Sequence, residues 1–141
     1  MTFRSDLYEY LKADVGLSAL VGNKIYPMFA ADSEVSAPYI VYNVIFSAPV
    51  YHMEPVGTNN ESVMTRVNIQ FDVWGETSES AINIQAAMDA ALSGFSGQMN
   101  SGTYVRRVFK RGQIDTYEAS SDGTNEPEYK IMLDYEFWYN A

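Results

Sequence analysis

The sequence predicts an α+β fold, a two-layer sandwich in which a mainly antiparallel sheet carries two helices packed on one face. Apolar and polar residues alternate over 63–74 and 128–139, as they do in strands with one buried face. Two other segments, near the N-terminus and over 79–92, repeat apolar residues at helical spacing instead. The order helix, strands, helix, strands, with no obvious linker, predicts a single domain over residues 1–141.

Each predicted helix combines an apolar stripe with end signals. Near the N-terminus, Thr2 is a suitable N-cap and Gly16 is expected to end the helix, with one further short turn before Gly22. The buried stripe of this helix is Phe3, Leu7, Tyr10 and Leu11. Thr77 or Ser78 can cap the second helix. Its stripe is Ala81, Ile84, Met88, Ala91 and Leu92.

Five segments are predicted as strands: 24–29, 38–46, 63–74, 104–111 and 128–139. Pro27 favours an edge position for the first of them, because proline cannot donate a ladder hydrogen bond. The second is apolar in both alternating sets, so both of its faces are expected to be partly covered. Two connections, 47–62 and 112–127, exceed the usual loop length, which predicts a functional or disordered role.

Composition narrows the class of protein. A chain of 141 residues with 47% hydrophobic residues can bury a core without staples, and it contains no cysteine for disulfides, thiolate metal sites or a cysteine nucleophile. The N-terminal residues lack the apolar segment of a signal peptide, and no apolar run could span a membrane, so we expect a soluble product made in the cytoplasm. The net charge of −9 disfavours sequence-independent binding to nucleic acid.

Motifs for chemistry are scarce, so we expect no catalytic residue, no cofactor site and no metal site. His52 is the only histidine, and no G-x-S-x-G accompanies it, so a loop position is the favoured interpretation. Four carboxylates in one predicted loop could attract a hard cation, but a solvated acidic loop is favoured: Asp115, Glu118, Asp122 and Glu126. Three strand carboxylates are the only candidates for an acid–base pair: Asp72, Asp134 and Glu136.

A basic cluster offers the sharpest candidate for a protein contact. Four of the nine basic residues lie within six positions: Arg106, Arg107, Lys110 and Arg111. They could pair across the sheet with Asp134 and Glu136, which would make them structural. Alternatively, they could meet an acidic loop of a neighbouring copy, whose residues would include Asp115, Glu118 and Asp122.

Two tryptophans complete the candidate subunit interface. Trp74 and Trp138 both fall on the otherwise polar faces of their strands, near Met64 and Met132 in the alternation. Exposed Trp, Tyr and Met on a sheet face are typical of protein interfaces. A small second core under a folded-back loop would explain them nearly as well.

Five short motifs, taken in order, resemble a known family: Val21–Pro27 (VGNKIYP), Pro38–Tyr42 (PYIVY), Gln70–Trp74 (QFDVW), Ala91–Gly94 (ALSG) and Tyr129–Trp138 (YKIMLDYEFW). Together they resemble the tail-completion proteins of long-tailed bacteriophages, also called head–tail joining or tail terminator proteins. The resemblance spans nearly the whole chain. The acidic region 112–127 is longer than this family leads us to expect.

The resemblance implies a structural role in the virion and no enzymatic activity. Members are thought to form a ring, typically of six copies, at the head-proximal end of the tail, after assembly in the host cytoplasm. The ring would contact the tail tube protein and the head–tail connector protein, while DNA passes through without specific binding and no membrane is involved. A head-completion or connector subunit is the nearest alternative, and a small ligand-binding α+β domain is a third.

Overall fold

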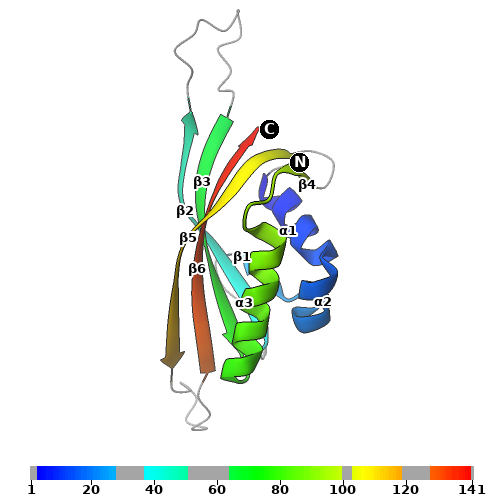
Figure 1. The fold of residues 1–141 in the computed structure, drawn as a ribbon, viewed down its shortest axis with the longest axis vertical. Coiled ribbons are helices and arrows are strands. Elements are labelled where there is room, and N and C mark those ends of the chain that lie inside the picture. The colour runs from blue at the N-terminus through cyan, green and yellow to red at the C-terminus, as the bar shows by residue number, and fades with distance from the viewer. Residues whose placement is uncertain (1–2, 28–36, 51–63, 100–102, 119–127, 141) are drawn as a thin grey trace, which may run out of the picture.

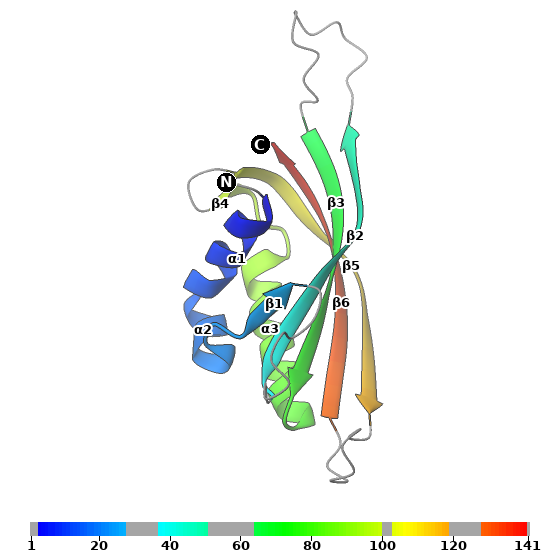
Figure 2. The same cartoon turned by 180° about the vertical axis from the view of Figure 1, so that it is seen from behind.

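The computed structural model describes residues 3–27, 37–50, 64–99, 103–118 and 128–140, with only the backbone for Tyr117, Glu118 and Glu128. In this part of the chain the helices are α1 (Phe3–Ala13), α2 (Val15–Val21) and α3 (Ser78–Leu92). The strands are β1 (Ile25–Pro27), β2 (Tyr39–Val50), β3 (Met64–Gly75), β4 (Gly97–Met99), β5 (Thr103–Glu118) and β6 (Glu128–Asn140). The helices all lie on one side of the sheet (Figures 1 and 2).

The six strands form one mixed sheet in the order β1-β2-β3-β6-β5-β4. β1 runs parallel to β2, whereas β2–β3, β3–β6, β6–β5 and β5–β4 pair antiparallel. The long β3–β6 pairing, which includes Phe71 opposite Leu133, places the last strand of the described chain in the middle of the sheet. Strands distant in sequence therefore form the centre, and short strands form the two edges.

The predicted architecture of a two-layer sandwich with a mainly antiparallel sheet is wrong. The sheet is mixed and curls as a half-barrel around the helices, which number three in the described residues (Figure 1). Strands of 12 to 16 residues accumulate much twist. Register shifts between Val44 and Phe46, Val105 and Arg107, and Lys110 and Gly112 add to it, because bulges bend a strand and increase its local twist.

The additional helix arises at Asp14. Its side chain accepts a hydrogen bond from the backbone N–H of Leu17 at 3.0 Å, which caps α2. Gly16 was expected to end the first helix, but it lies inside α2, and α1 already stops at Ala13. An aspartate that caps a new helix therefore takes precedence over a glycine two positions later.

The alternation of apolar and polar residues over 63–74 and 128–139 correctly predicted the two central strands, β3 and β6. Inward residues of β3 and β6 are buried against α1 and α3 except near the strand ends, whereas their alternating partners stay partly exposed, apart from Glu136. The second predicted helix is α3, with Thr77 as its N-cap. Simple alternation over 104–111 would place Val105 and Val108 on opposite faces, and this is wrong, because the bulge after Val105 leaves both buried. β2 and β5 also continue into residues expected to be loops.

Two polar contacts fasten α1 to the rest of the fold. Thr103, at the start of β5, donates to the buried carboxylate of Asp6 at 2.5 Å. The Tyr10 hydroxyl donates to the carbonyl of Ala91 in α3 at 2.6 Å. Burial raises the pKa of Tyr10, and the charge of Asp14 adds to this shift. Among the described helices, none has the length and apolar character needed to cross a membrane.

Candidate assembly surfaces

The face of the sheet turned away from the helices, here called the outer face, is rich in aromatic and basic side chains. Its exposed apolar residues include Phe46 of β2 and Phe109 and Ile114 of β5. By register, Phe46 lies opposite Asn68. Asn68 lies opposite Glu136, which in turn lies opposite Phe109. One row of side chains thus crosses the outer face from β2 to β5.

Glu136 is the centre of this row and is 4% exposed. Arg111 forms an ion pair with its carboxylate, and Arg66 Nε lies 3.5 Å from Oε1. Burial by itself raises the pKa of Glu136. Hydrogen bonding by Arg111, the nearby indole N–H of Trp138 and the charges of Arg111 and Arg66 outweigh burial, so the net pKa is lowered. The folded protein therefore keeps this buried carboxylate charged.

Three buried polar atoms on the outer face have no hydrogen-bond partner within the described residues. They are Asn68 Oδ1, Asp134 Oδ1 and Trp138 Nε1, the last of which acts on the Glu136 carboxylate but does not meet hydrogen-bond geometry with it. Burial raises the pKa of Asp134; the charge of Arg111 opposes this shift, and Glu136 adds to it. Buried polar atoms are nearly always paired in native proteins. The outer face therefore keeps unused hydrogen-bonding capacity beside its central ion pairs.

Cations lie over several aromatic rings of the outer face. Lys130 Nζ is 5.0 Å from the ring centroid of Trp74. The guanidinium groups of Arg66 and Arg111 lie 5.3 Å and 5.6 Å from the rings of Phe46 and Phe109. These distances are typical of cation–π contacts, which favour arginine and tryptophan. Trp74 is therefore half-buried by its neighbours on the sheet.

The four residues of the basic cluster have four different environments. Arg111 pairs with Glu136, as one of the two interpretations expected, and Lys110 reaches the opposite side of the sheet. Arg106 Nε donates to Asn140 Oδ1 at 2.9 Å, and Arg107 Nη1 donates to a backbone carbonyl, that of Gly94, at 3.3 Å. The bulges at 105/107 and 110/112 explain why these residues do not share faces by simple alternation.

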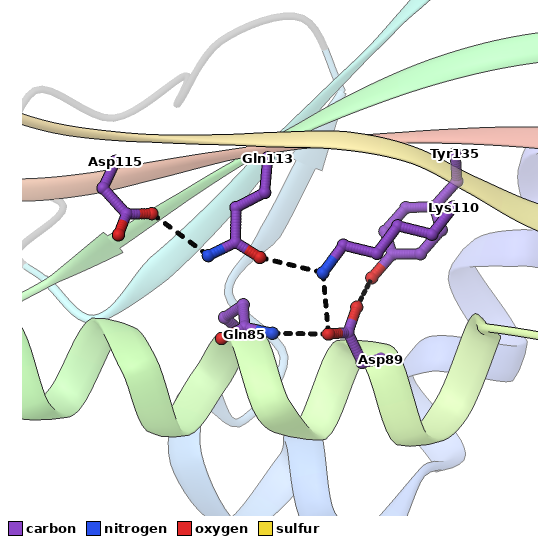
Figure 3. A network of polar contacts seen from close by, with 6 residues as sticks. All are labelled: Gln85, Asp89, Lys110, Gln113, Asp115 and Tyr135. Carbon is purple, nitrogen blue, oxygen red and sulfur yellow. Dashed lines mark hydrogen bonds and ion pairs between the residues drawn. The ribbon is translucent and has the colours of Figure 1, made fainter.

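Lys110 belongs to a polar network on the helix side of the sheet (Figure 3). Asp89 of α3 accepts hydrogen bonds from Gln85, Lys110 and Tyr135, with Lys110 Nζ 2.8 Å from its carboxylate. Burial, with the hydrogen bond and charge of Asp89, raises the pKa of Tyr135. Gln113 accepts from Lys110 at 2.8 Å. Sequence periodicity does not mark Asp89, because it lies outside the apolar stripe of α3 and 21 positions from its cation.

Of the three acidic residues predicted at the subunit interface, the structure describes the side chain of Asp115. Gln113 donates to the exposed Asp115 at 3.1 Å, so this carboxylate is tied to β5. Glu118 is described by its backbone alone, at the end of β5, and Asp122 lies outside the described residues. An approach of these acids to the basic cluster of another copy thus stays a prediction.

The described residues do not form a recognisable catalytic or metal site. The Asp72 carboxylate accepts from Gln70 at 2.9 Å, and Glu136 is engaged by two arginines. No group of three or more potential metal-ligating side chains occurs in the described ranges. His52 and Glu126 lie outside those ranges.

Two hollows lined by described residues flank the long strands. One of about 190 Å³ is lined by residues of β3, β5 and β6: Gln70, Gly112, Gln113, Ile114, Met132, Leu133 and Asp134. The other, of about 270 Å³, is lined mainly by α1 and β2: Phe3, Arg4, Val44, Ser47, Val67 and Tyr139. Both are open to the surface and neither contains a cluster of titratable groups. They suit side chains of a protein partner better than a reacting substrate.

Comparison with known proteins identifies the family. The family model described as "Tail completion protein gp17" matches residues 5–140. A chain from the virion of a native gene transfer agent (GTA) particle has the same fold, with a TM-score of 0.66 and 16% identity over 99% of this chain and 95% of that one. No curated protein matches the sequence significantly. The family predicted from the five motifs is confirmed. The chain therefore belongs to the tail completion protein gp17 family and is a structural protein of a bacteriophage tail.

Proposed function

We propose that this protein forms a ring of six copies on the head-proximal end of the tail tube. The ring ends growth of the tube and offers the surface to which the connector of the DNA-filled head binds. The observation that carries this proposal is the family match over residues 5–140, to proteins described as completing the tail. The fold shared with a chain of a gene transfer agent virion supports a place in such a particle.

The outer face supports a role in protein contacts rather than in chemistry. Trp, Phe, Met and Arg are enriched at protein interfaces, and this face combines them with three unpaired buried polar atoms. We assign the contacts with other tail proteins to this face, with Trp74 and Trp138 among the contact residues. A ring that only caps and joins needs no catalytic group or cofactor, so we infer a non-enzymatic function.

Arg106 and Arg107 are the members of the basic cluster that we assign to contacts between copies. Their described partners are neutral, an amide oxygen and a backbone carbonyl, so both charges remain available to an acidic neighbour. The acidic segment with Asp115, Glu118 and Asp122 is that neighbour in the next copy. Arg106→Glu should weaken ring assembly, whereas Lys12→Glu on α1, an equal change of charge, should not.

DNA passes through the proposed ring without specific contacts. The net charge of −9 repels phosphate, which favours passage over binding. We infer that the acidic segment or the Asp72 face lines the channel. Replacing Glu118 and Asp122 together with lysine should then slow DNA ejection or hinder assembly. Unchanged infectivity would count against an acidic lining of the channel.

Electron microscopy of lysates from a phage lacking this gene tests the function directly. Overlong tails together with DNA-filled, tailless heads are expected, and a plasmid copy of the gene should restore normal virions. Tails of normal length that fail to join heads would reduce the role to joining, as in a head-completion subunit. Normal infectious virions would refute an assembly function.

A further inference from the structure

The outer edges of β2 and β5 each have a half that pairs with no described residue, although the inner edges pair with β3 and β6. β1 covers β2 only at residues 40–42, so the outer edge of residues 43–50 is open within the described chain. β4 covers β5 at 103–105, and Gly94 and Phe95 bond to Val108, so residues 109–118 are open in the same sense. An open strand edge presents unpaired N–H and C=O groups that can template another strand.

Exposed apolar side chains accompany both open edges. Ile45 and Phe46, on the β2 edge, are 56% and 47% exposed, and Phe109 and Ile114, on the β5 edge, are 44% and 58% exposed. The hollow lined by Val44 and Ser47 borders the first edge, and the hollow lined by Gly112 and Ile114 borders the second. Each edge therefore offers side chains and a recess in addition to backbone groups.

The two open edges have compatible directions. β2, β3, β6 and β5 are joined by three successive antiparallel pairings, so β2 and β5 themselves run antiparallel. When two copies stand side by side in the same orientation, the β5 edge of one meets the β2 edge of the next as an antiparallel pair. This contact is head-to-tail, and repeated head-to-tail contacts close into a ring when the rotation allows it.

The positions of the open halves add a geometric match. Phe46 and Phe109 lie at the same level of the sheet, through Asn68 and Glu136. The middle of 43–50 lies near this row of residues. The middle of 109–118 lies about four to five residues farther along β5, which is about 15 Å in the direction of the strand. Crossing four strands covers about 19 Å. The resulting stagger corresponds to a strand tilt of about 40°, within the 35–45° typical of closed barrels.

We propose that a second copy of this chain is the partner of both edges, with residues 109–118 of one copy pairing antiparallel with 43–50 of the next. The inference deepens the ring proposed above and rests on it. It replaces the pairing of Arg106 and Arg107 with the acidic segment, because β5 of one copy then faces β2, and not β5, of the next. The sheets of neighbouring copies then join into one tilted barrel, and Ser47 of one copy faces Gln113 of the next.

Proline substitutions test the backbone contact at chosen positions. Ile40 and Ser47 both lie on the inner face of β2, because the bulge between Val44 and Phe46 adds one residue between them. The Ile40 N–H donates outward to Lys24, so the Ser47 N–H also points to the open edge. The same alternation directs the N–H of Gln113 outward, because Val108 bonds to Gly94 and Phe95. Ser47→Pro and Gln113→Pro remove these donors without touching the inner ladder. Ser47→Ala and Gln113→Ala are the matched controls.

Native mass spectrometry of the purified chains gives the first readout. We expect the wild type and both alanine variants to form one closed oligomer and each proline variant alone to be monomeric. An equimolar mixture of the proline variants should form a one-to-one pair, because each supplies the edge that the other lacks. This rescue also shows that both variants are folded.

Cross-linking gives a second readout that captures weak association. The chain contains no cysteine, so a Ser47→Cys, Gln113→Cys double variant carries the only two thiols. A short bis-maleimide should convert it into a ladder of multimers, whereas either single variant should yield no product.

Three outcomes would overturn the inference. Oligomers that persist in both proline variants would place the contact elsewhere and leave the ring standing. A dimer of Ser47→Pro alone would indicate a two-fold β5–β5 contact instead. A wild type that stays monomeric at the highest attainable concentration, without a ladder in the double variant, would remove both the edge contact and the ring.

Discussion

Replacing Glu136 with glutamine should destabilise the protein by about 1–2 kcal/mol. The glutamine keeps the shape and an acceptor for Arg111, but it removes the buried charge that Arg111 and Arg66 contact. Hydrogen bonds to charged groups contribute about 1.5–3 kcal/mol and neutral ones about 0.5–1.5 kcal/mol. The side chains of the two arginines are 52% and 40% exposed, so water relieves them and the loss stays below that of a fully buried broken pair.

The effect should depend on pH. The pKa of Glu136 is lowered in the folded protein, so its contribution to stability is fully present above the unfolded pKa, about 4.3. That contribution is lost as the pH falls through the folded value. The difference between wild type and Glu136→Gln should therefore be full at pH 7 and shrink below about pH 4. Asp134, whose pKa is raised, acts in the opposite direction in both proteins.

Thermal denaturation followed by circular dichroism measures both effects. At pH 7 the Glu136→Gln variant should melt about 3–7 °C below the wild type, given the usual entropy of unfolding for a chain of this size. Glu9→Gln is the control, because Glu9 and Lys12 form an exposed pair at 3.6 Å and should contribute about 0.5 kcal/mol or less. Melting within 1 °C of wild type, or a gap that does not change at low pH, would refute the buried ion-pair argument.

Two backbone positions give further predictions. Gly75→Ala should cost about 1–3 kcal/mol in chemical denaturation, because an added Cβ would lie 2.5 Å from the backbone nitrogen of Ala81. Gly112→Ala, where nothing lies within 4 Å, should stay near wild-type stability; equal losses in both would contradict the packing reason. Thr77→Ala should cost about 1 kcal/mol through the lost cap to the Ser80 N–H, and Thr77→Ser should recover most of it.

The parts of the fold predicted correctly are those where one side chain period applies over a whole element. Apolar residues alternate without interruption in β3 and β6 and repeat at helical spacing in α3, so the sequence identifies the core residues of these elements. The faces of β5 could not be predicted in this way, because each bulge inserts an extra residue and shifts the alternation of the side chains. β1 and β2 are close in sequence, which favours a hairpin, yet they pair parallel, with Ile25 opposite Ile40 and Pro27 opposite Tyr42. Neither the curl nor this pairing can be derived from local patterns.

The candidate contact residues show the same limit. The basic cluster and both tryptophans were found because their residue types are unusual at their positions. Asp89, the carboxylate that pairs with Lys110, was not found, because it comes from α3, which only the fold brings close to β5. Arg66, the second cation beside Glu136, was missed for the same reason. The open edges of β2 and β5 arise because their neighbours β1 and β4 are short, and the amino-acid composition does not predict these strand lengths.

The central position of β6 also affects how the chain folds during synthesis. β3 reaches its full length at Gly75, but its neighbour β6 is complete only at Asn140, 65 positions later. At about 5–20 residues per second, the ribosome leaves one side of β3 unpaired for about 3–13 s. The pairings of β6 with β3 and β5, in the middle of the sheet, therefore form after β2, β3 and β5 have all been synthesised. Nascent chains of this protein should become protease-resistant in one late step, once β6 has left the ribosome.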